Sequence, residues 1–160
     1  MYLFLDQASR KTGWAHFSSE MILLNYGVID LSDKEIDQVN KRYKLIHLVN
    51  NLVEKYNIKQ IALEGIYKNN VQVFKILAKV QGSLEDYCCT KNIVCFSFDN
   101  SGEWRKYIGI KAKDRKTYKA ETKKYKIEKY GLPDNLSEDE YDAVAQGDAY
   151  FVMLELKGIE

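Results

Sequence analysis

Short apolar runs alternate along this chain with segments of helical periodicity, which is the pattern of an α/β protein. Residues 2–5 and 14–17 are expected to form two strands joined by a polar turn at 9–13, and residues 21–29 to add a third strand. Strands that follow one another so closely pair as an antiparallel meander. Apolar side chains at spacings of three and four then predict an amphipathic helix over residues 34–56.

The second half of the chain continues the alternation. Two further strands are expected at residues 58–63 and 93–98. The expected helices cover residues 70–88, a short turn near 104–107, residues 119–130 and residues 138–156. Residues that cap helix N-termini precede three of these helices, namely Asn69 or Asn70, Asn100 with Glu103, and Ser137 with Glu140.

Length and composition are those of an ordinary globular protein. The chain has 160 residues, of which 46% are hydrophobic and 29% charged, so we expect a single domain over residues 1–160. No apolar run approaches the length of a membrane span, and we expect a cytoplasmic protein with no membrane partner. Cys88, Cys89 and Cys95 lack partners at zinc-like spacing, and we expect reduced residues in or near the core.

Charge is distributed unevenly, although the formal net charge is only +1. Residues 104–130 include eleven basic and three acidic side chains, whereas residues 133–160 include eight acidic and one basic. A pair of solvated helix faces is one explanation. The aromatic residues within the basic segment favour a surface that binds nucleic acid, and they are Trp104, Tyr107, Tyr118 and Tyr125.

Single acidic residues follow two of the predicted buried strands. Asp6 ends the first of them and Glu64 ends the strand at residues 58–63. An unpaired buried carboxylate is costly, so these positions need a partner. Two parallel strands bring their terminal carboxylates side by side, at the edge where α/β sheets bind ligands. Taken alone, Asp6 is equally consistent with a cap of the turn that follows it.

The last helix supplies further acids. Asp139 and Asp142 are three residues apart and share a helix face. Glu138 also shares a face with Asp142, so periodicity leaves open which acid is its partner. Asp148 points away from that face, and we expect it to make a polar contact elsewhere. Small residues at 143, 145, 147 and 149 predict that this helix lies close against the sheet.

Four clustered carboxylates require cations. Two carboxylates about 4 Å apart repel by roughly 4 kcal/mol at an effective dielectric constant of 20. Carboxylate oxygens suit Mg²⁺, and two such ions in one active site can activate a water and stabilise the leaving oxygen of a phosphodiester. If the acids served only to cap and solubilise, Glu138 and Glu140 would be explained, but the two strand-end acids would not.

Three segments of the sequence resemble the acidic motifs of a known family. LFLDQASRKTGWA, IALEGIY and DEYDAVA look like those of the RuvC-type Holliday-junction resolvases, in the ribonuclease H-like superfamily, and are most similar to phage-encoded members. The resemblance implies a ribonuclease H-like α/β fold with a mixed five-stranded sheet and helices on both faces. It also implies a homodimeric endonuclease, dependent on two Mg²⁺ or Mn²⁺ ions, that nicks Holliday junctions and other branched DNA to leave 5′-phosphate and 3′-hydroxyl ends.

The resemblance also implies roles for individual residues. Asp6, Glu64, Asp139 and Asp142 match the metal-binding carboxylates, and the helix at residues 70–88 matches the one used for dimerisation. Lys106 and Lys119 match the basic residues placed against the scissile phosphate, with Arg105, Lys113 and Arg115 as other candidates. The residues expected to bind DNA are Tyr67, which matches an aromatic at the junction crossover, and Arg10, Lys11, Arg105, Lys111, Lys113, Arg115 and Lys123.

Gln7 and Ala8 mark a departure from the family, because bacterial relatives usually have Pro-Gly after the first Asp. Two other functions remain open. One is a ribonuclease H-like nuclease that acts on RNA, such as the YqgF-type relatives, from which Glu64 distinguishes this chain. The other is a non-catalytic protein that binds branched DNA. An actin-like ATPase also opens with an Asp-bearing hairpin, but this chain is too short and lacks a second Gly-rich phosphate loop.

Overall fold

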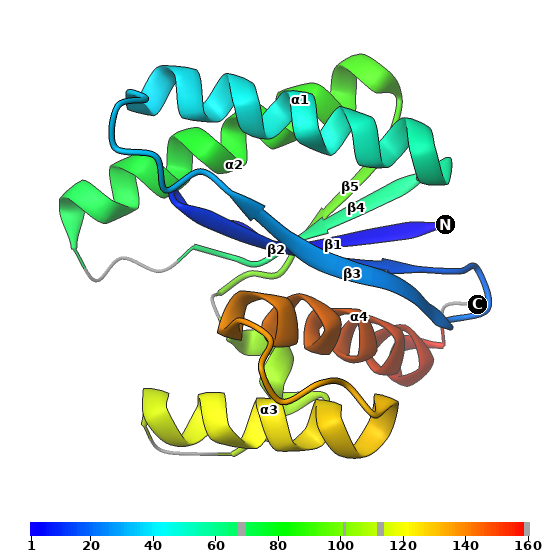
Figure 1. Cartoon of the computed structure of the whole chain (residues 1–160). Coiled ribbons are helices and arrows are strands. Elements are labelled where there is room, and N and C mark those ends of the chain that lie inside the picture. Colours follow the sequence, from blue (N-terminus) through cyan, green and yellow to red (C-terminus); the bar gives the residue numbers. More distant parts are fainter. Residues whose placement is uncertain (67–69, 101, 112–113, 159–160) are drawn as a thin grey trace.

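A computed structural model of the chain describes residues 1–66, 70–100, 102–111 and 114–158 (Figure 1). Its strands form one mixed sheet in the order β3-β2-β1-β4-β5. The strands are β1 (Tyr2–Asp6), β2 (Lys11–Phe17), β3 (Leu23–Asp30), β4 (Gln60–Leu63) and β5 (Val94–Ser97). β1, β2 and β3 pair antiparallel, and β4 pairs parallel to both β1 and β5. The predicted mixed five-stranded sheet is confirmed. The turn predicted at residues 9–13 is shorter, because Lys11 already pairs in β2.

Helices cover both faces of the sheet, as predicted (Figure 1). α1 (Gln38–Tyr56) and α2 (Val71–Lys91) lie on one face, and α4 (Glu138–Lys157) lies on the other. α3 (Arg115–Tyr130) packs on the outer side of α4, and the 3₁₀ turn η1 (Glu103–Lys106) also contacts α4. No helix in the described parts of the chain is both long and apolar enough to cross a membrane.

Capping interactions set where the helices begin. Asn70 caps α2, and Ser137 with Glu140 forms the predicted capping box of α4. α1 begins at residue 38 and not at 34, because the Asp37 side chain accepts hydrogen bonds from two N–H groups of its first turn. Asp114 likewise caps α3, which therefore begins at residue 115 and not at 119.

The capping box predicted at Asn100 and Glu103 is wrong. The residue before η1 is Gly102, with φ of 77°, and its turn receives no capping hydrogen bond from a side chain of the described residues. The Glu103 carboxylate accepts a hydrogen bond from the backbone N–H of Asp99. Glycine adopts a positive φ without steric cost, because it has no Cβ. The chain therefore enters η1 through a left-handed turn.

Alternate residues of the central strands build two cores. Leu3 and Leu5 of β1 face α1 and α2, whereas Phe4 between them packs in the core beneath α4. Gly147 of α4 lies over the ring of Phe17, where a Cβ would approach ring carbons to 2.3 Å. Small residues thus let α4 lie close to the sheet, as the sequence predicted. This close packing brings the first turns of α4 to the end of β1.

Two of the three cysteines are less buried than expected. All three cysteines are free thiols, and Cys88 is buried, but Cys89 and Cys95 are exposed, so a core position for these two is wrong.

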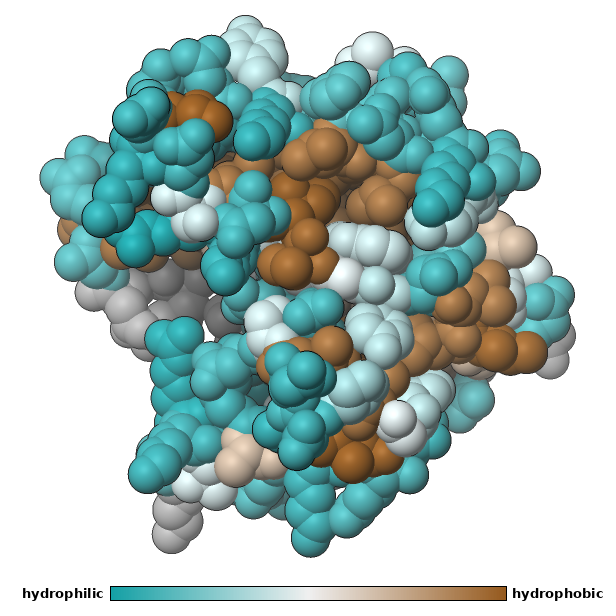
Figure 2. Space-filling model, in the orientation of Figure 1, coloured by the Kyte–Doolittle hydropathy of each residue, from teal (hydrophilic) through white to brown (hydrophobic). Residues whose placement is uncertain are grey.

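β3 is an edge strand, and Leu24 and Val28 on it are exposed. Figure 2 shows apolar surface on this side of the molecule, between the two helical layers.

Candidate active site

The ends of β1 and β4 lie side by side. Leu5 pairs with Leu63 in parallel register, so Asp6 and Glu64 emerge at the same edge of the sheet. Gln7 joins the two strand ends, since its side-chain carbonyl accepts from the Glu64 N–H at 3.0 Å and its amide donates to the Glu64 carbonyl. The amide of Gln7, which stands where bacterial relatives have proline, therefore fixes the distance between the two acidic positions. Sequence reasoning assigned it no such role.

A third carboxylate comes from α4. Asp142 is only 2% exposed and interacts with the two strand-end acids. Burial, followed by the charges of Glu64 and Asp142, raises the pKa of Asp6 well above its usual value, and a hydrogen bond with Glu64 adds to this rise. Burial also raises the pKa of Asp142, although Lys119 and Arg105 oppose the rise. Three acids from three elements thus form one electrostatic unit, here called the acidic cluster (Asp6, Glu64 and Asp142).

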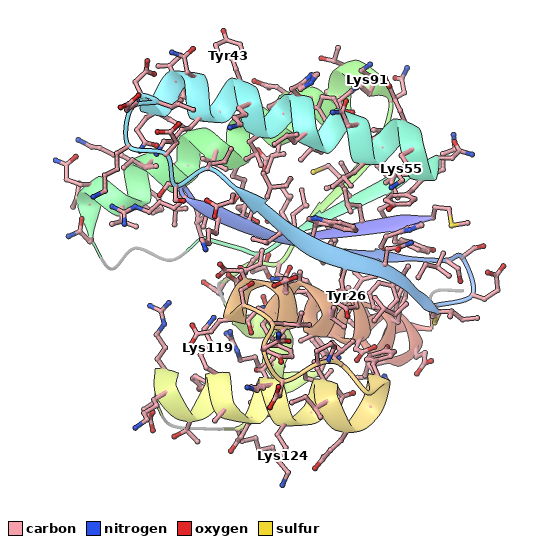
Figure 3. The ribbon with its side chains drawn as sticks, viewed as in Figure 1. Tyr26, Tyr43, Lys55, Lys91, Lys119 and Lys124 are labelled. Carbon is pink, nitrogen blue, oxygen red and sulfur yellow. The ribbon has the colours of Figure 1, made fainter. Side chains whose placement is uncertain are left out.

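Two cations of the chain balance this cluster. The Lys119 ammonium lies 2.6 Å and the Arg105 guanidinium 3.0 Å from the same oxygen of Asp142, Oδ2. Arg105 also lies 4.0 Å from Glu64 Oε1. Burial lowers the pKa of Lys119, but Asp142 and then Asp6 more than offset this, and the net pKa is raised. Figure 3 shows Lys119 between α3 and α4.

Asp139 lies one turn before Asp142, at the start of α4. It is half-buried, and burial raises its pKa, while Lys119 and more weakly Lys11 and Arg115 lower it. Its side chain makes no hydrogen bond or ion pair with other described residues. The structure therefore brings three of the four predicted acids together and leaves Asp139 beside them.

The other predicted residues lie around this centre or apart from it. Lys106 is on the surface, where its ammonium pairs with Glu103 at 2.7 Å, and the structure brings its neighbour Arg105 to the acids instead. Lys123 donates to the Asp134 carbonyl, and Lys11 pairs with Asp30 at 3.4 Å. Exposed positions are occupied by Arg10, Lys11, Lys111 and Arg115, whereas Tyr67 and Lys113 lie outside the described residues.

Trp104 is a further residue of the site. It is completely buried, so the prediction that it belongs to a nucleic-acid surface is wrong. Its indole N–H donates to Glu64 Oε1 at 2.8 Å, and the Gly102 N–H donates to the same oxygen at 3.1 Å. Sequence reasoning missed this role because nothing in a single sequence tells which aromatic of a basic segment turns inward.

The donor set of the cluster suits a hard divalent cation. In the described part of the chain, no three Asp, Glu, His or Cys side chains are grouped so that they could hold a metal ion as they stand, and Lys119 and Arg105 contact Asp142 Oδ2. Asp142 Oδ1 is nevertheless buried and has no hydrogen-bond partner among the residues that the structure describes. An unpartnered buried carboxylate oxygen is costly, and coordination to a cation would satisfy it. The residues present therefore fit Mg²⁺ or Mn²⁺.

A second buried ionic contact anchors α3, the helix that carries Lys119. Lys126 is fully buried, and its ammonium pairs with Asp148 of α4. The Tyr130 hydroxyl also donates to Asp148, and Lys129 lies 3.0 Å from it. Asp148 thus makes the polar contact that the sequence predicted. Because Lys119 and Lys126 are seven residues apart on one face of α3, this anchor holds Lys119 over Asp142.

This anchor predicts a pH dependence of stability. Burial lowers the pKa of Lys126 from 10.5 to about 8, although Asp148 opposes this. Between these two pH values the unfolded chain holds a proton that the native chain has lost, so the free energy of unfolding rises with pH. Across this interval we expect the free energy of unfolding of wild type to rise by about 1 kcal/mol per pH unit relative to that of Lys126→Met. Urea unfolding measures both values.

The control for this experiment is Lys124→Met, which removes an exposed lysine of the same helix whose ammonium lies 3.8 Å from Glu128. Figure 3 shows Lys124 pointing away from the body of the protein. The free energy of unfolding of Lys124→Met is expected to equal that of wild type at every pH. If the free energies of unfolding of wild type and Lys126→Met changed with pH in parallel, Lys126 would not be the cause of the pH dependence.

Comparison with known proteins adds to this geometry. No protein-family model and no curated protein matches the sequence. Among solved structures, T. thermophilus RuvC in complex with a Holliday junction substrate matches with a TM-score of 0.78 and 9% identity, over 97% of this chain and 94% of that chain. The yeast mitochondrial Holliday junction resolvase Ydc2 matches with a TM-score of 0.58 and 18% identity, over 98% and 80% of the two chains.

Fowlpox virus resolvase, in a complex with Holliday junction DNA, matches with a TM-score of 0.56 and 11% identity, over 98% of this chain and 96% of that chain. The similarity in each case extends over nearly the whole of this chain. The chain therefore has the ribonuclease H-like fold of the RuvC-type Holliday-junction resolvases, the fold that the resemblance of its three acidic motifs predicted.

Proposed function

We propose that this chain is a metal-dependent, structure-selective endonuclease that nicks Holliday junctions and other branched DNA and leaves 5′-phosphate and 3′-hydroxyl ends. The observation that carries the proposal is the convergence of Asp6, Glu64 and Asp142 at the carboxyl ends of two parallel strands. Two cations lie against these acids, in a fold shared with resolvases. Such a site suits hydrolysis of a phosphodiester better than binding alone.

Asp6, Glu64 and Asp142, with Asp139 beside them, would hold two Mg²⁺ or Mn²⁺ ions. When bound, such ions activate a water molecule and stabilise the leaving oxygen of a phosphodiester. Burial and the charges of Glu64 and Asp142 raise the pKa of Asp6, and a bound divalent cation would oppose this rise by stabilising the ionised carboxylate. Lys119 and Arg105 are available to stabilise negative charge on the scissile phosphate. We assign Arg105 the role predicted for Lys106, because Lys106 pairs with Glu103 on the surface.

Basic side chains near the site would bind the DNA backbone. Lys11 and Arg115 are exposed, and both lower the pKa of Asp139, so they lie near the acidic residues. We propose that they act with Arg10 and Lys111, and that Tyr67 and Lys113, which lie outside the described residues, also bind DNA. Contacts to several phosphates make binding fall steeply with salt.

A symmetric pair of cuts requires two copies of the site. We propose a homodimer formed through α2, whose first turn exposes Val71 and Val73 with 54% and 53% of their surface accessible. A twofold axis would present one site to each of two symmetric DNA strands. We propose in addition that residues 1–160 act as a single domain in the cytoplasm, that of a host cell if the chain is phage-encoded.

The test is cleavage of labelled four-way, flap and linear DNA, with Mg²⁺ or with a chelator. We expect paired nicks in the four-way junction that require Mg²⁺ and that DNA ligase can reseal. Tight binding to the junction without cleavage in Mg²⁺ or Mn²⁺ would support a non-catalytic binding protein instead. Cleavage of RNA with no cleavage of branched DNA would support the RNA nuclease.

A further inference from the structure

The indole of Trp104 holds one oxygen of Glu64 from within the core. The Trp104 and Gly102 N–H groups both donate to Glu64 Oε1, at 2.8 Å and 3.1 Å. Two donors on one oxygen fix the rotation of the carboxylate about its Cγ–Cδ bond, and this determines where the other oxygen, Oε2, lies. Trp104 is completely buried and packs in the core beneath α4, so its N–H is itself held rigidly.

The face of the same indole supports Arg105. The guanidinium carbon lies 4.2 Å from the centre of the Trp104 ring and 5.4 Å from that of Tyr118. From this position the guanidinium reaches Asp142 Oδ2 at 3.0 Å. Gly102 suits this place because its φ is 77°, and a Cβ there would lie 2.3 Å from a terminal nitrogen of Arg105 and displace the guanidinium. One buried ring thus contacts both the acid of β4 and the cation that holds the acid of α4.

We propose that Trp104 is a positioning residue of the active site, which orients the carboxylate of Glu64 directly and that of Asp142 through Arg105. The proposal rests on the proposed function, in that these carboxylates bind metal. Its physical basis is that Trp104 contacts Glu64 Oε1 and Arg105 contacts Asp142 Oδ2, while Asp142 Oδ1 has no partner within the described parts of the chain. Groups that hydrogen-bond to metal ligands in this way fix their orientation and strengthen metal binding.

Trp104→Phe is the sharpest test, because it removes the N–H donor and keeps an aromatic ring in the core. We expect Mn²⁺ to bind about tenfold more weakly, measured by calorimetry on the DNA-free protein. KM for the junction should remain unchanged, and added metal should restore most of the lost cleavage rate. Trp14→Phe is the matched control, since Trp14 packs against Tyr56 in the core on the other face of the sheet. Its Mn²⁺ affinity should equal that of wild type.

Indole N–H signals separate this proposal from the function on which it rests. The chain has two tryptophans, so its ¹H–¹⁵N spectrum contains two indole signals, which the two variants assign. We expect the Trp104 N–H to resist exchange with solvent without metal, and to shift when Mg²⁺ is added. Rapid exchange, or unchanged Mn²⁺ affinity in Trp104→Phe, would overturn the positioning role. A protected N–H in a protein that binds neither ion would support the hydrogen bond and overturn both the role in metal binding and the proposed metal site.

Discussion

Glu64→Gln is expected to lower the rate of junction cleavage at least about a hundredfold, with little change in junction affinity. Loss of a group that merely orients a metal ligand typically costs 10- to 100-fold, so replacing a charged ligand by a neutral amide should cost at least the upper value. Cleavage is measured as single-turnover rates in Mg²⁺, and affinity by titration in a chelator. Affinity should change by less than about twofold, because Glu64 is not part of the basic surface.

The amide should preserve the fold. Its carbonyl can replace Glu64 Oε1 as acceptor for the N–H groups of Trp104 and Gly102. The substitution also removes a charge that raises the pKa of Asp6, so the thermal midpoint should be equal to that of wild type or higher. Glu103→Gln is the control, because Glu103 is an acid of η1 that pairs with Lys106 outside the cluster. Cleavage by Glu64→Gln at the wild-type rate would exclude Glu64 from the chemistry.

The sheet could be predicted from the sequence because its pattern is local. Apolar runs ending in single acids marked β1 and β4, and parallel pairing was expected because it places both acids at one edge of the sheet. The starts of α1 and α3 were missed for a physical reason. Asp37 and Asp114 cap these helices, and each lies within a polar segment where periodicity gives no boundary.

The convergence of acids in the candidate site could be predicted where acids follow strands, whereas contacts that depend on tertiary packing could not be predicted. Asp6, Glu64 and Asp142 come from element ends whose placement the sequence indicates. The orientation of η1 decides whether Arg105 or Lys106 reaches the acids. Arg105 contacts Asp142, whereas Lys106 pairs with Glu103 on the surface. The inward turn of Trp104 also depends on packing against α4. Sequence composition marked this segment as basic and aromatic, but it could not separate its buried members from those on the surface.

Gly13→Ala is expected to destabilise the protein by about 3 kcal/mol and to lower its thermal midpoint by about 10 °C. A Cβ on Gly13 would lie 1.9 Å from the backbone oxygen of Asp139 and 3.0 Å from the backbone N of Glu140. Backbone atoms cannot rotate away as a side chain can, so the first turn of α4 must move away from β2. Because that turn leads into Asp142, cleavage should also fall, even well below the unfolding temperature.

Gly82→Ala provides the matched control, because Gly82 lies inside α2 and a Cβ there would meet no atom of another described element within 4 Å. Alanine there should raise stability by up to about 1 kcal/mol, since it favours the helix and restricts the unfolded chain. Calorimetry measures both midpoints, and cleavage rates are compared at about 20 °C below that of Gly13→Ala. If Gly13→Ala melted and cleaved like wild type, the start of α4 could not rest against β2. If it melted lower but cleaved normally at that temperature, the contact would stabilise the fold without positioning Asp142.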